Sequence, residues 1–310
     1  GVGPLSCRSR DLSRPLHDLG YGLPVRGAPG DLTANTSVFQ THFMTTNTDV
    51  SLPFTPTSHT ASEPVSDGVA VIASRRPWLW AAFWSLIPVV LTSIGFGAAQ
   101  SQHLDDRHTY LWVAAAVSVA AVLGLVRMAR ATPTLTAFGF RRPTNGSTAG
   151  LLGFAPLVLG PVLVALTTGV GVDRARIPGF LWLAAAAAVS EEVWYRGLVM
   201  AVLRQCSLRT AIVGSAAIFG VLHLANLFGG VSPVYAVLQL AFAALFGLVA
   251  ALVVTHTRSL WPVIAWHFAH DAVTYVGGDV ITPTALGVLA LECVVLTAYA
   301  IVLWRRLPKA

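Results

Sequence analysis

Long apolar segments alternate with short polar connections along most of the chain, beginning near Trp78. A helix needs about 20 apolar residues to span a bilayer, whereas a barrel strand needs only about 10, with a two-residue alternation. The segments are too long for strands and lack that alternation. The pattern predicts an all-α polytopic membrane protein of about eight transmembrane helices, over residues 77–99, 109–129, 149–171, 179–203, 209–228, 233–255, 259–277 and 284–304.

The first part of the chain, residues 1–75, has a different composition. It is rich in Ser, Thr, Pro, Gly and Asp and has no sustained apolar period, which is typical of disordered segments. We therefore expect a disordered N-terminal tail, followed by a helical transmembrane domain over residues 76–306. The sequence begins with Gly1, and we expect the natural start at Met44. We expect no signal peptide, because the first apolar segment is too long and further spans follow it.

The overall composition supports the membrane class. Hydrophobic residues make up 55% of the chain and charged residues 11%, whereas soluble domains carry about 25% charged residues. Basic residues exceed acidic ones by 20 to 14, but they form no cluster interleaved with aromatic residues, so no nucleic-acid partner is expected. Cys7, Cys206 and Cys293 are far apart and indicate neither a disulfide framework nor a CxxC metal site.

The basic residues predict the orientation, because short cytoplasmic loops carry an excess of Lys and Arg. With eight spans, one side of the membrane receives twelve basic residues: Arg75, Arg76, Arg127, Arg130, Arg141, Arg142, Arg204, Arg209, Arg258, Arg305, Arg306 and Lys309. The other side receives three: Arg107, Arg174 and Arg176. We therefore expect both termini in the cytoplasm. Arg far outnumbers Lys, which indicates a GC-rich genome and hence a bacterial plasma membrane.

Ionisable side chains lie inside four of the apolar segments. Burying such a side chain in a bilayer costs free energy, so its presence there indicates a function. The fourth segment contains SEEVWYRG, the fifth FGVLHLAN, the seventh WHFAHDAV and the eighth a lone Glu292. Residues four apart share a helix face, so three pairs are expected to be neighbours: Glu192 with Arg196, Phe219 with His223, and His267 with Asp271. Glu191 is turned by about 100° from Glu192 and can face a different neighbour. Carboxylates and imidazoles are the components of sites that activate water.

These motifs resemble those of the CAAX prenyl-protease and bacteriocin-processing (CPBP, or Abi) intramembrane endopeptidases. The family motifs EExxxR, FxxxH and HxxxN/D appear here in order, and SLWPVIAWH before the third is also similar. The resemblance covers about residues 178–278. It implies a hydrolase that cleaves a peptide bond inside the bilayer, in a membrane-embedded or membrane-associated protein or peptide.

The resemblance also implies roles for single residues. Glu191 and Glu192 correspond to the glutamates that activate the attacking water. His223 and His267 correspond to the histidines that hold the water, the developing oxyanion or, tentatively, a divalent metal such as zinc. Asp271 stands where many members have Asn. Because an ionised Asp only accepts hydrogen bonds, we expect Asp271 to orient His267 or to help bind a metal.

Other polar residues in these segments are expected to be structural. Arg196, Phe219 and Asn226 would support the site, with Arg196 held next to Glu192. His270 matches no motif position and is expected to face Trp or Tyr neighbours. Glu292 has no partner in the sequence and is expected at a helix interface.

Two other classes of function fit the same residues. A non-catalytic immunity or scaffold protein could keep the fold and the site without using them. An ion-coupled transporter could relay charge through buried carboxylates and histidines. Transporters of that kind often have inverted repeats and paired broken helices, and the sequence shows neither.

Overall fold

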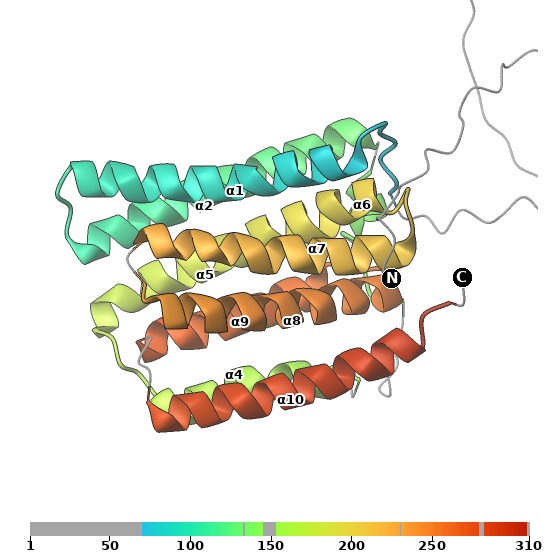
Figure 1. Ribbon diagram of the computed structural model, residues 1–310. Helices are drawn as coiled ribbons and strands as arrows, with labels where there is room; N and C mark the ends of the chain where they lie inside the picture. Colours follow the sequence, from blue (N-terminus) through green and yellow to red (C-terminus); the bar gives the residue numbers. More distant parts are fainter. Residues whose placement is uncertain (1–69, 133, 145–152, 230, 279–281, 309–310) are drawn as a thin grey trace, which may run out of the picture. The chain divides into compact units, whose positions relative to one another are not determined.

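The computed structural model describes residues 70–132, 134–144, 153–229, 231–278 and 282–308. Most of the expected tail, the expected start at Met44, and Lys309 lie outside these residues. The described part is helical, without a strand, and each of the eight expected segments contains a helix (Figure 1). The prediction of an all-α fold with about eight long helices is confirmed.

The main elements follow one another along the chain as nine α-helices in the described residues: α1 (Pro77–Ser101), α2 (Asp106–Ala131), α4 (Ala155–Thr168), α5 (Ile177–Glu191), α6 (Met200–Leu203), α7 (Leu208–Leu222), α8 (Pro233–Thr257), α9 (Trp261–Gly277) and α10 (Pro283–Arg305). A π-helical segment, η3 (Glu192–Val199), joins α5 to α6 without a break. A 3₁₀ segment, η4 (His223–Gly229), continues α7. Two short 3₁₀ helices, η1 (Leu135–Phe138) and η2 (Arg174–Arg176), lie in connections.

Five of the described helices are long and apolar enough to cross a membrane: α1, α2, α7 with η4 as far as Phe228, α8 and α10. The chain is therefore a multi-pass membrane protein. The other three expected spans are shorter or interrupted: α4 has 14 residues, α9 has 17, and α5–η3–α6 changes its helix type midway. A 14-residue helix is about 21 Å long, less than the roughly 30 Å of a hydrocarbon core. The described part of the expected span 149–171 is thus too short to cross a bilayer alone.

Capping residues mark the starts of α7, α8 and α10. Ser207, Ser232 and Thr282 cap α7, α8 and α10, and each side-chain oxygen accepts a hydrogen bond from the N–H three residues on, at 2.9, 3.2 and 3.0 Å. Such caps satisfy N–H groups that have no partner within the helix. Pro233 and Pro283 follow two of these caps, at a position where the missing N–H costs nothing.

The bundle is built around the continuous rod formed by α5, η3 and α6. Helix α2 packs on one side of α5 and α9 on another; α7 packs against α8, and α10 packs against α4 and α8 (Figure 1). Small residues allow the closest of these crossings. A Cβ atom on Gly220 of α7 would collide with Ala244 of α8, and one on Gly247 of α8 would press against Ala216 of α7.

Side chains and backbone atoms from three helices hold the π-helical segment η3, in which every residue is buried. The bonds are Trp194 Nε1 to the Ala120 carbonyl (2.9 Å), Tyr195 OH to the Ser85 carbonyl (3.2 Å) and Ser215 Oγ to the Tyr195 carbonyl (3.0 Å). They tie η3 to α2, α1 and α7. π-Helical turns are rare and occur frequently at functional sites. This one begins at the second glutamate of the first motif.

The last residues of the expected tail are extended and hydrogen-bonded to the helices. The Ala70 N–H donates to the Ala137 carbonyl and the Ile72 N–H to the Ala201 carbonyl. Residues 70–72 thus already bond to the helical part of the chain, ahead of the expected boundary at residue 75.

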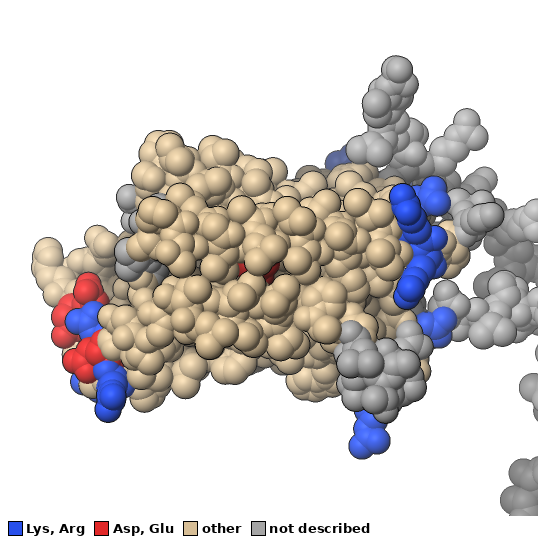
Figure 2. Space-filling model, turned by 90° about the horizontal axis from the view of Figure 1, so that it is seen from below, with Lys and Arg blue, Asp and Glu red and all other residues tan. Residues whose placement is uncertain are grey.

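Charged side chains gather at the two ends of the described helices (Figure 2). Figure 2 shows basic residues at one end, a mixture of acidic and basic residues at the other, and a surface almost free of charge between them. A small area of acidic atoms near the middle of that surface is the exception. This distribution fits helices that run between two membrane surfaces; the expected orientation stays a prediction.

Candidate active site

Glu192, the second glutamate of the first motif, is fully buried and bonded on two sides. Its Oε1 accepts hydrogen bonds from Arg196 Nη1 at 3.0 Å and from His267 Nδ1 at 2.9 Å. The Arg196 side chain is fully buried as well, as a structural ion pair requires. Helical spacing predicts the bond to Arg196. It does not predict the bond to His267, which lies 75 positions away and ties η3 to α9.

Glu191 faces a cavity and makes different contacts. Its side chain is 28% exposed, whereas that of Glu192 is 0% exposed. Glu191 Oε2 lies 3.6 Å from His267 Nε2, and no described residue hydrogen-bonds to this oxygen. The two adjacent glutamates therefore have separate environments, as their angular separation on the helix predicts.

His267 lies between three carboxylates. Its Nδ1 faces Glu192, while its Nε2 lies near Glu191 and 3.5 Å from Asp271 Oδ2. The short contact at Nδ1 means that Glu192 orients the ring. Asp271 and Glu191 both lie near Nε2, the ring nitrogen that does not contact Glu192. Sequence reasoning predicted that Asp271 is a neighbour of His267 but missed the part played by Glu192.

His223 occupies the point where α7 ends and η4 begins. Its Nδ1 lies 2.8 Å from the carbonyl oxygen of Phe219. A carbonyl oxygen only accepts, so Nδ1 carries the hydrogen and donates it. The last carbonyls of an α-helix have no partner within the helix, and the His223 ring satisfies one of them. The remaining nitrogen, Nε2, is left for the cavity that His223 lines.

Phe219 supports the site through its ring. The ring meets that of His223 edge-on, with centroids 4.6 Å apart, and carries the Arg196 guanidinium over its face at 4.3 Å. A cation over an aromatic face is attracted to it. Phe219 therefore positions His223 and holds Arg196 beside Glu192, which explains why an aromatic residue is useful four positions before the histidine.

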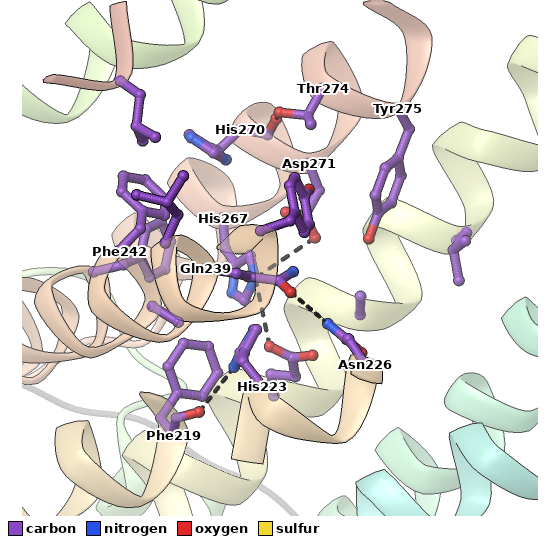
Figure 3. A pocket seen from close by; sticks show the side chains of 18 of the residues that line it. Phe219, His223, Asn226, Gln239, Phe242, His267, His270, Asp271, Thr274 and Tyr275 are labelled. Carbon is purple, nitrogen blue, oxygen red and sulfur yellow. Dashed lines mark hydrogen bonds and ion pairs between the residues drawn. The ribbon is translucent and has the colours of Figure 1, made fainter. Parts of the chain in front are cut away.

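Four of the expected catalytic residues line one cavity of about 500 Å³: Glu191, His223, His267 and Asp271 (Figure 3). Glu192 does not line this cavity; it contacts the Nδ1 atom of His267, which does. The other lining residues come from α5, η3, α7, η4 and α9 and also from α1, α2, α4, α8 and α10, and they are mostly apolar. A cavity of this size and character is typical of sites for small molecules or short peptide segments.

The cavity also holds a second acid–histidine pair. His270 Nε2 lies 3.5 Å from Glu292 Oε2, and the Glu292 side chain is only 3% exposed. His270 stacks on Phe242, with ring centroids 5.2 Å apart, and not on the expected Trp or Tyr. Glu292 has its partner on α9, so no spacing within α10 could predict it. The only signal in the sequence is a carboxylate inside an apolar span.

Asn226 is bonded to a residue that sequence reasoning overlooked. Its Nδ2 donates to Gln239 Oε1 at 2.8 Å, and both side chains line the cavity. Figure 3 shows this bond among the residues of the cavity wall. The available signal was a single glutamine in the apolar sequence of α8.

The cavity offers donors that divalent metals use, but the described residues contain no group of three His, Cys, Asp or Glu side chains arranged to hold a metal ion. A catalytic zinc site needs three protein ligands. The expected pair of His223 and His267 thus lacks a third ligand in place. The need for a metal stays a prediction.

The part of the chain that carries this site is similar to a known protein family. Residues 173–273, about a third of the chain, match the family model described as Type II CAAX prenyl endopeptidase Rce1-like. All five expected catalytic residues lie within this range, and the match confirms the resemblance seen in the three motifs. No curated protein and no solved structure matches the chain.

Proposed function

We propose that this membrane protein is an intramembrane endopeptidase in which Glu191 activates the attacking water. The match of residues 173–273 to the family model described as Type II CAAX prenyl endopeptidase Rce1-like supports this class of activity. One observation carries the assignment of the base. Glu192 is fully buried and bonded through Oε1 to Arg196 and His267, whereas the Glu191 side chain is 28% exposed and lines the cavity.

The proposed reaction is general-base hydrolysis of a peptide bond. A water molecule beside Glu191 gives a proton to the carboxylate while its oxygen attacks the carbonyl carbon of the substrate. The new C–O bond moves the electron pair of the carbonyl onto its oxygen. When the C–N bond breaks, the proton on Glu191 passes to the leaving nitrogen and the carboxylate is restored. General acid–base catalysis of this kind contributes a factor of about 10²–10⁴.

The two motif histidines position the reactants in this proposal. His223 donates through Nδ1 to Phe219, so its Nε2 can accept the second hydrogen of the water. His267 is held at Nδ1 by Glu192 and presents Nε2 between Glu191 and Asp271. In this proposal His267 is an imidazolium with a hydrogen on each ring nitrogen. The Nε2 hydrogen lies between the two carboxylates and fixes the direction of Glu191. Asp271 acts as an acceptor that holds the His267 ring from the cavity side.

We propose a membrane-associated protein or peptide as the substrate, and the lipid bilayer as the surroundings of the site. The family name and the position of the cavity inside a bundle of apolar helices support this class. We also propose a bacterial plasma membrane with both termini in the cytoplasm, for which the distribution of arginines is the support.

The direct test uses the purified full chain in lipid nanodiscs and a quenched fluorogenic peptide that ends in a farnesylated CAAX sequence. We expect the wild type to cleave it and Glu191→Gln to be at least about 100-fold slower, with a Tm close to that of the wild type. Asp106→Asn is the matched control, because it removes a carboxylate at an exposed helix start without touching the cavity. A Glu191→Gln protein that cleaves at the wild-type rate would remove Glu191 from the reaction.

The two alternatives give different results. For a scaffold or immunity protein, membranes with the wild type and with Glu191→Gln would contain the same set of peptide ends. For an ion-coupled transporter, proteoliposomes would take up a solute in response to an ion gradient. An endopeptidase predicts instead that an uncleaved precursor accumulates with Glu191→Gln, which membrane proteomics would detect.

A further inference from the structure

Peptide hydrolysis needs a hydrogen-bond donor directed at the carbonyl oxygen, where negative charge develops in the transition state. Asp271 cannot supply it when ionised, because a carboxylate only accepts hydrogen bonds. Glu191 and Glu292, which also line the cavity, are carboxylates too. The donor must therefore come from another group in the cavity wall.

Most of the N–H and O–H groups in that wall already serve other acceptors. His223 Nδ1 donates to Phe219, and Tyr195 OH donates to the Ser85 carbonyl. Four threonine hydroxyls donate to carbonyls four residues earlier in their own helices: Thr92, Thr167, Thr168 and Thr274. Tyr235 and Tyr275 have partners as well. His267 Nε2 lies between two carboxylates, and Ser93 is an exposed hydroxyl on α1.

His270 Nε2 lies 3.5 Å from a carboxylate oxygen of Glu292, and Asn226 Nδ2 gives one of its two hydrogens to Gln239. The Gln239 NH₂ group is the one side-chain amide of the wall that donates to no acceptor among the described residues. We propose that Gln239 Nε2 is the donor that stabilises the oxyanion, with Asn226 as the residue that positions it; this inference rests on the proposed peptidase function. Gln239 Oε1 accepts from Asn226 Nδ2 at 2.8 Å, which fixes the plane of the amide. Its NH₂ group donates to no acceptor among the described residues and can turn to a ligand in the cavity.

The 3₁₀ geometry of η4 places Asn226 next to the water-binding histidine. Side chains three positions apart eclipse one another in a 3₁₀ helix, so Asn226 shares a face with His223. At about 2.0 Å of rise per residue, the two lie about 6 Å apart along the helix axis. The change from α-helix to 3₁₀ helix at His223 therefore brings an amide beside the imidazole.

Helix α8 places Gln239 on the face that meets the catalytic helix α9. Gln239, Phe242 and Phe246 are at positions i, i+3 and i+7 and so form one stripe. Phe242 stacks on His270, and the Phe246 ring lies 4.9 Å from that of His267. Gln239 is one turn further along this stripe. The amide pair thus joins η4, which also carries His223, to α8, which packs on the histidines of α9, around one cavity (Figure 3).

The substitution Gln239→Glu isolates the donor. A glutamate has the same shape and still accepts from Asn226, but it has no N–H group. We expect kcat for the farnesylated fluorogenic peptide to fall about 10²–10³-fold, with KM and Tm nearly unchanged. Gln239→Leu should lower kcat similarly without adding a charge. Asn226→Asp should also lower kcat, because the new carboxylate accepts from Gln239 Nε2 and turns the NH₂ group away from the substrate.

Two further variants separate this role from a structural one. Gln205→Leu removes a glutamine that is bonded to two backbone carbonyls outside the cavity, and we expect it to lower Tm but not kcat. Asp271→Asn restores an N–H donor to the cavity. In the Gln239→Leu background it should therefore raise kcat, and a double variant no faster than Gln239→Leu would contradict the inference.

A phosphinic peptide provides a measurement that does not depend on turnover, because its P–O⁻ group mimics the oxyanion. We expect Gln239→Leu and Gln239→Glu to weaken its binding about 100-fold or more relative to the wild type. If the wild type cleaves and binds while both variants keep its kcat and its affinity for the phosphinic peptide, Gln239 is not the donor and the proposed function stands. A raised KM at constant kcat would also overturn the inference, since it indicates ground-state binding. If the wild type neither cleaves nor binds, the proposed function fails, and the inference with it.

Discussion

Replacing each of the adjacent glutamates by glutamine should separate catalysis from folding. Glutamine keeps the size of the side chain and removes the charge. Glu192→Gln leaves Arg196 with no counter-ion at 3.0 Å and weakens the contact to His267 at 2.9 Å. Glu191→Gln removes a base from the cavity wall. It breaks no hydrogen bond at Oε2, which has no hydrogen-bond partner among the described residues, and it removes the charge that lies 3.6 Å from His267 Nε2.

The two substitutions should lower the free energy of unfolding by different amounts, because the Glu192 side chain is more deeply buried than that of Glu191. Removing one partner of a fully buried ion pair costs about 3–5 kcal/mol, and both side chains of the Glu192–Arg196 pair are 0% exposed. The Glu191 side chain is 28% exposed and makes only a longer contact, 3.6 Å, to His267, so we expect Glu191→Gln to lower the free energy of unfolding clearly less than Glu192→Gln. The order is reversed for activity: Glu191→Gln should lower kcat by at least about 100-fold in a folded protein.

The assay combines SDS-induced unfolding in mixed micelles with cleavage of the fluorogenic peptide. The double variant Glu192→Gln/Arg196→Gln should recover part of the lost stability, because no uncompensated charge remains. It should not recover activity, since His267 still lacks its carboxylate partner. A Glu191→Gln protein that stays active, beside a Glu192→Gln protein that is folded and inactive, would reverse the assignment of the base.

Four further predictions follow from the contacts. In the wild-type background, where Gln239 already supplies a donor, Asp271→Asn should lower kcat because it weakens the acceptor that holds His267, and Asp271→Ala should lower it further; full activity in Asp271→Ala would remove this residue from the site. Gly160→Ala should cost about 1–3 kcal/mol in SDS unfolding because its Cβ would overlap the Glu292 carboxylate, whereas Gly287→Ala, which points into open space, should not destabilise the protein. Reporter fusions should read cytoplasmic after η1 and after α10 and external between α1 and α2; a C-terminal fusion that reads external would contradict the expected eight spans. The divalent metal expected from the motif histidines predicts that dialysis against EDTA abolishes cleavage and that Zn²⁺ restores it, and a full rate after dialysis would argue against it.

Sequence patterns determined those features of this protein that depend on near neighbours in the chain. Each helix follows from an apolar segment, and the bond between Glu192 and Arg196 follows from a spacing of four. The separate environments of Glu191 and Glu192 follow from the rotation between adjacent helical residues. The resemblance to the CAAX-protease family follows from three short motifs that keep their order. All of these depend on local geometry, which one helix sets by itself.

Tertiary structure decided which side chains meet across helices. Glu192 with His267, His270 with Glu292, and Asn226 with Gln239 each join two elements, so no spacing within one element contains them. The helix types at the site were also outside the sequence pattern. Apolar segments look alike whether they form an α-helix, the π-helical η3 or the 3₁₀ η4, because bonds from neighbouring helices and the free carbonyls at a helix end select among them. The length of α4 was missed for a related reason: hydropathy measures how apolar a segment is, while packing against α9 and α10 determines how much of it is helical.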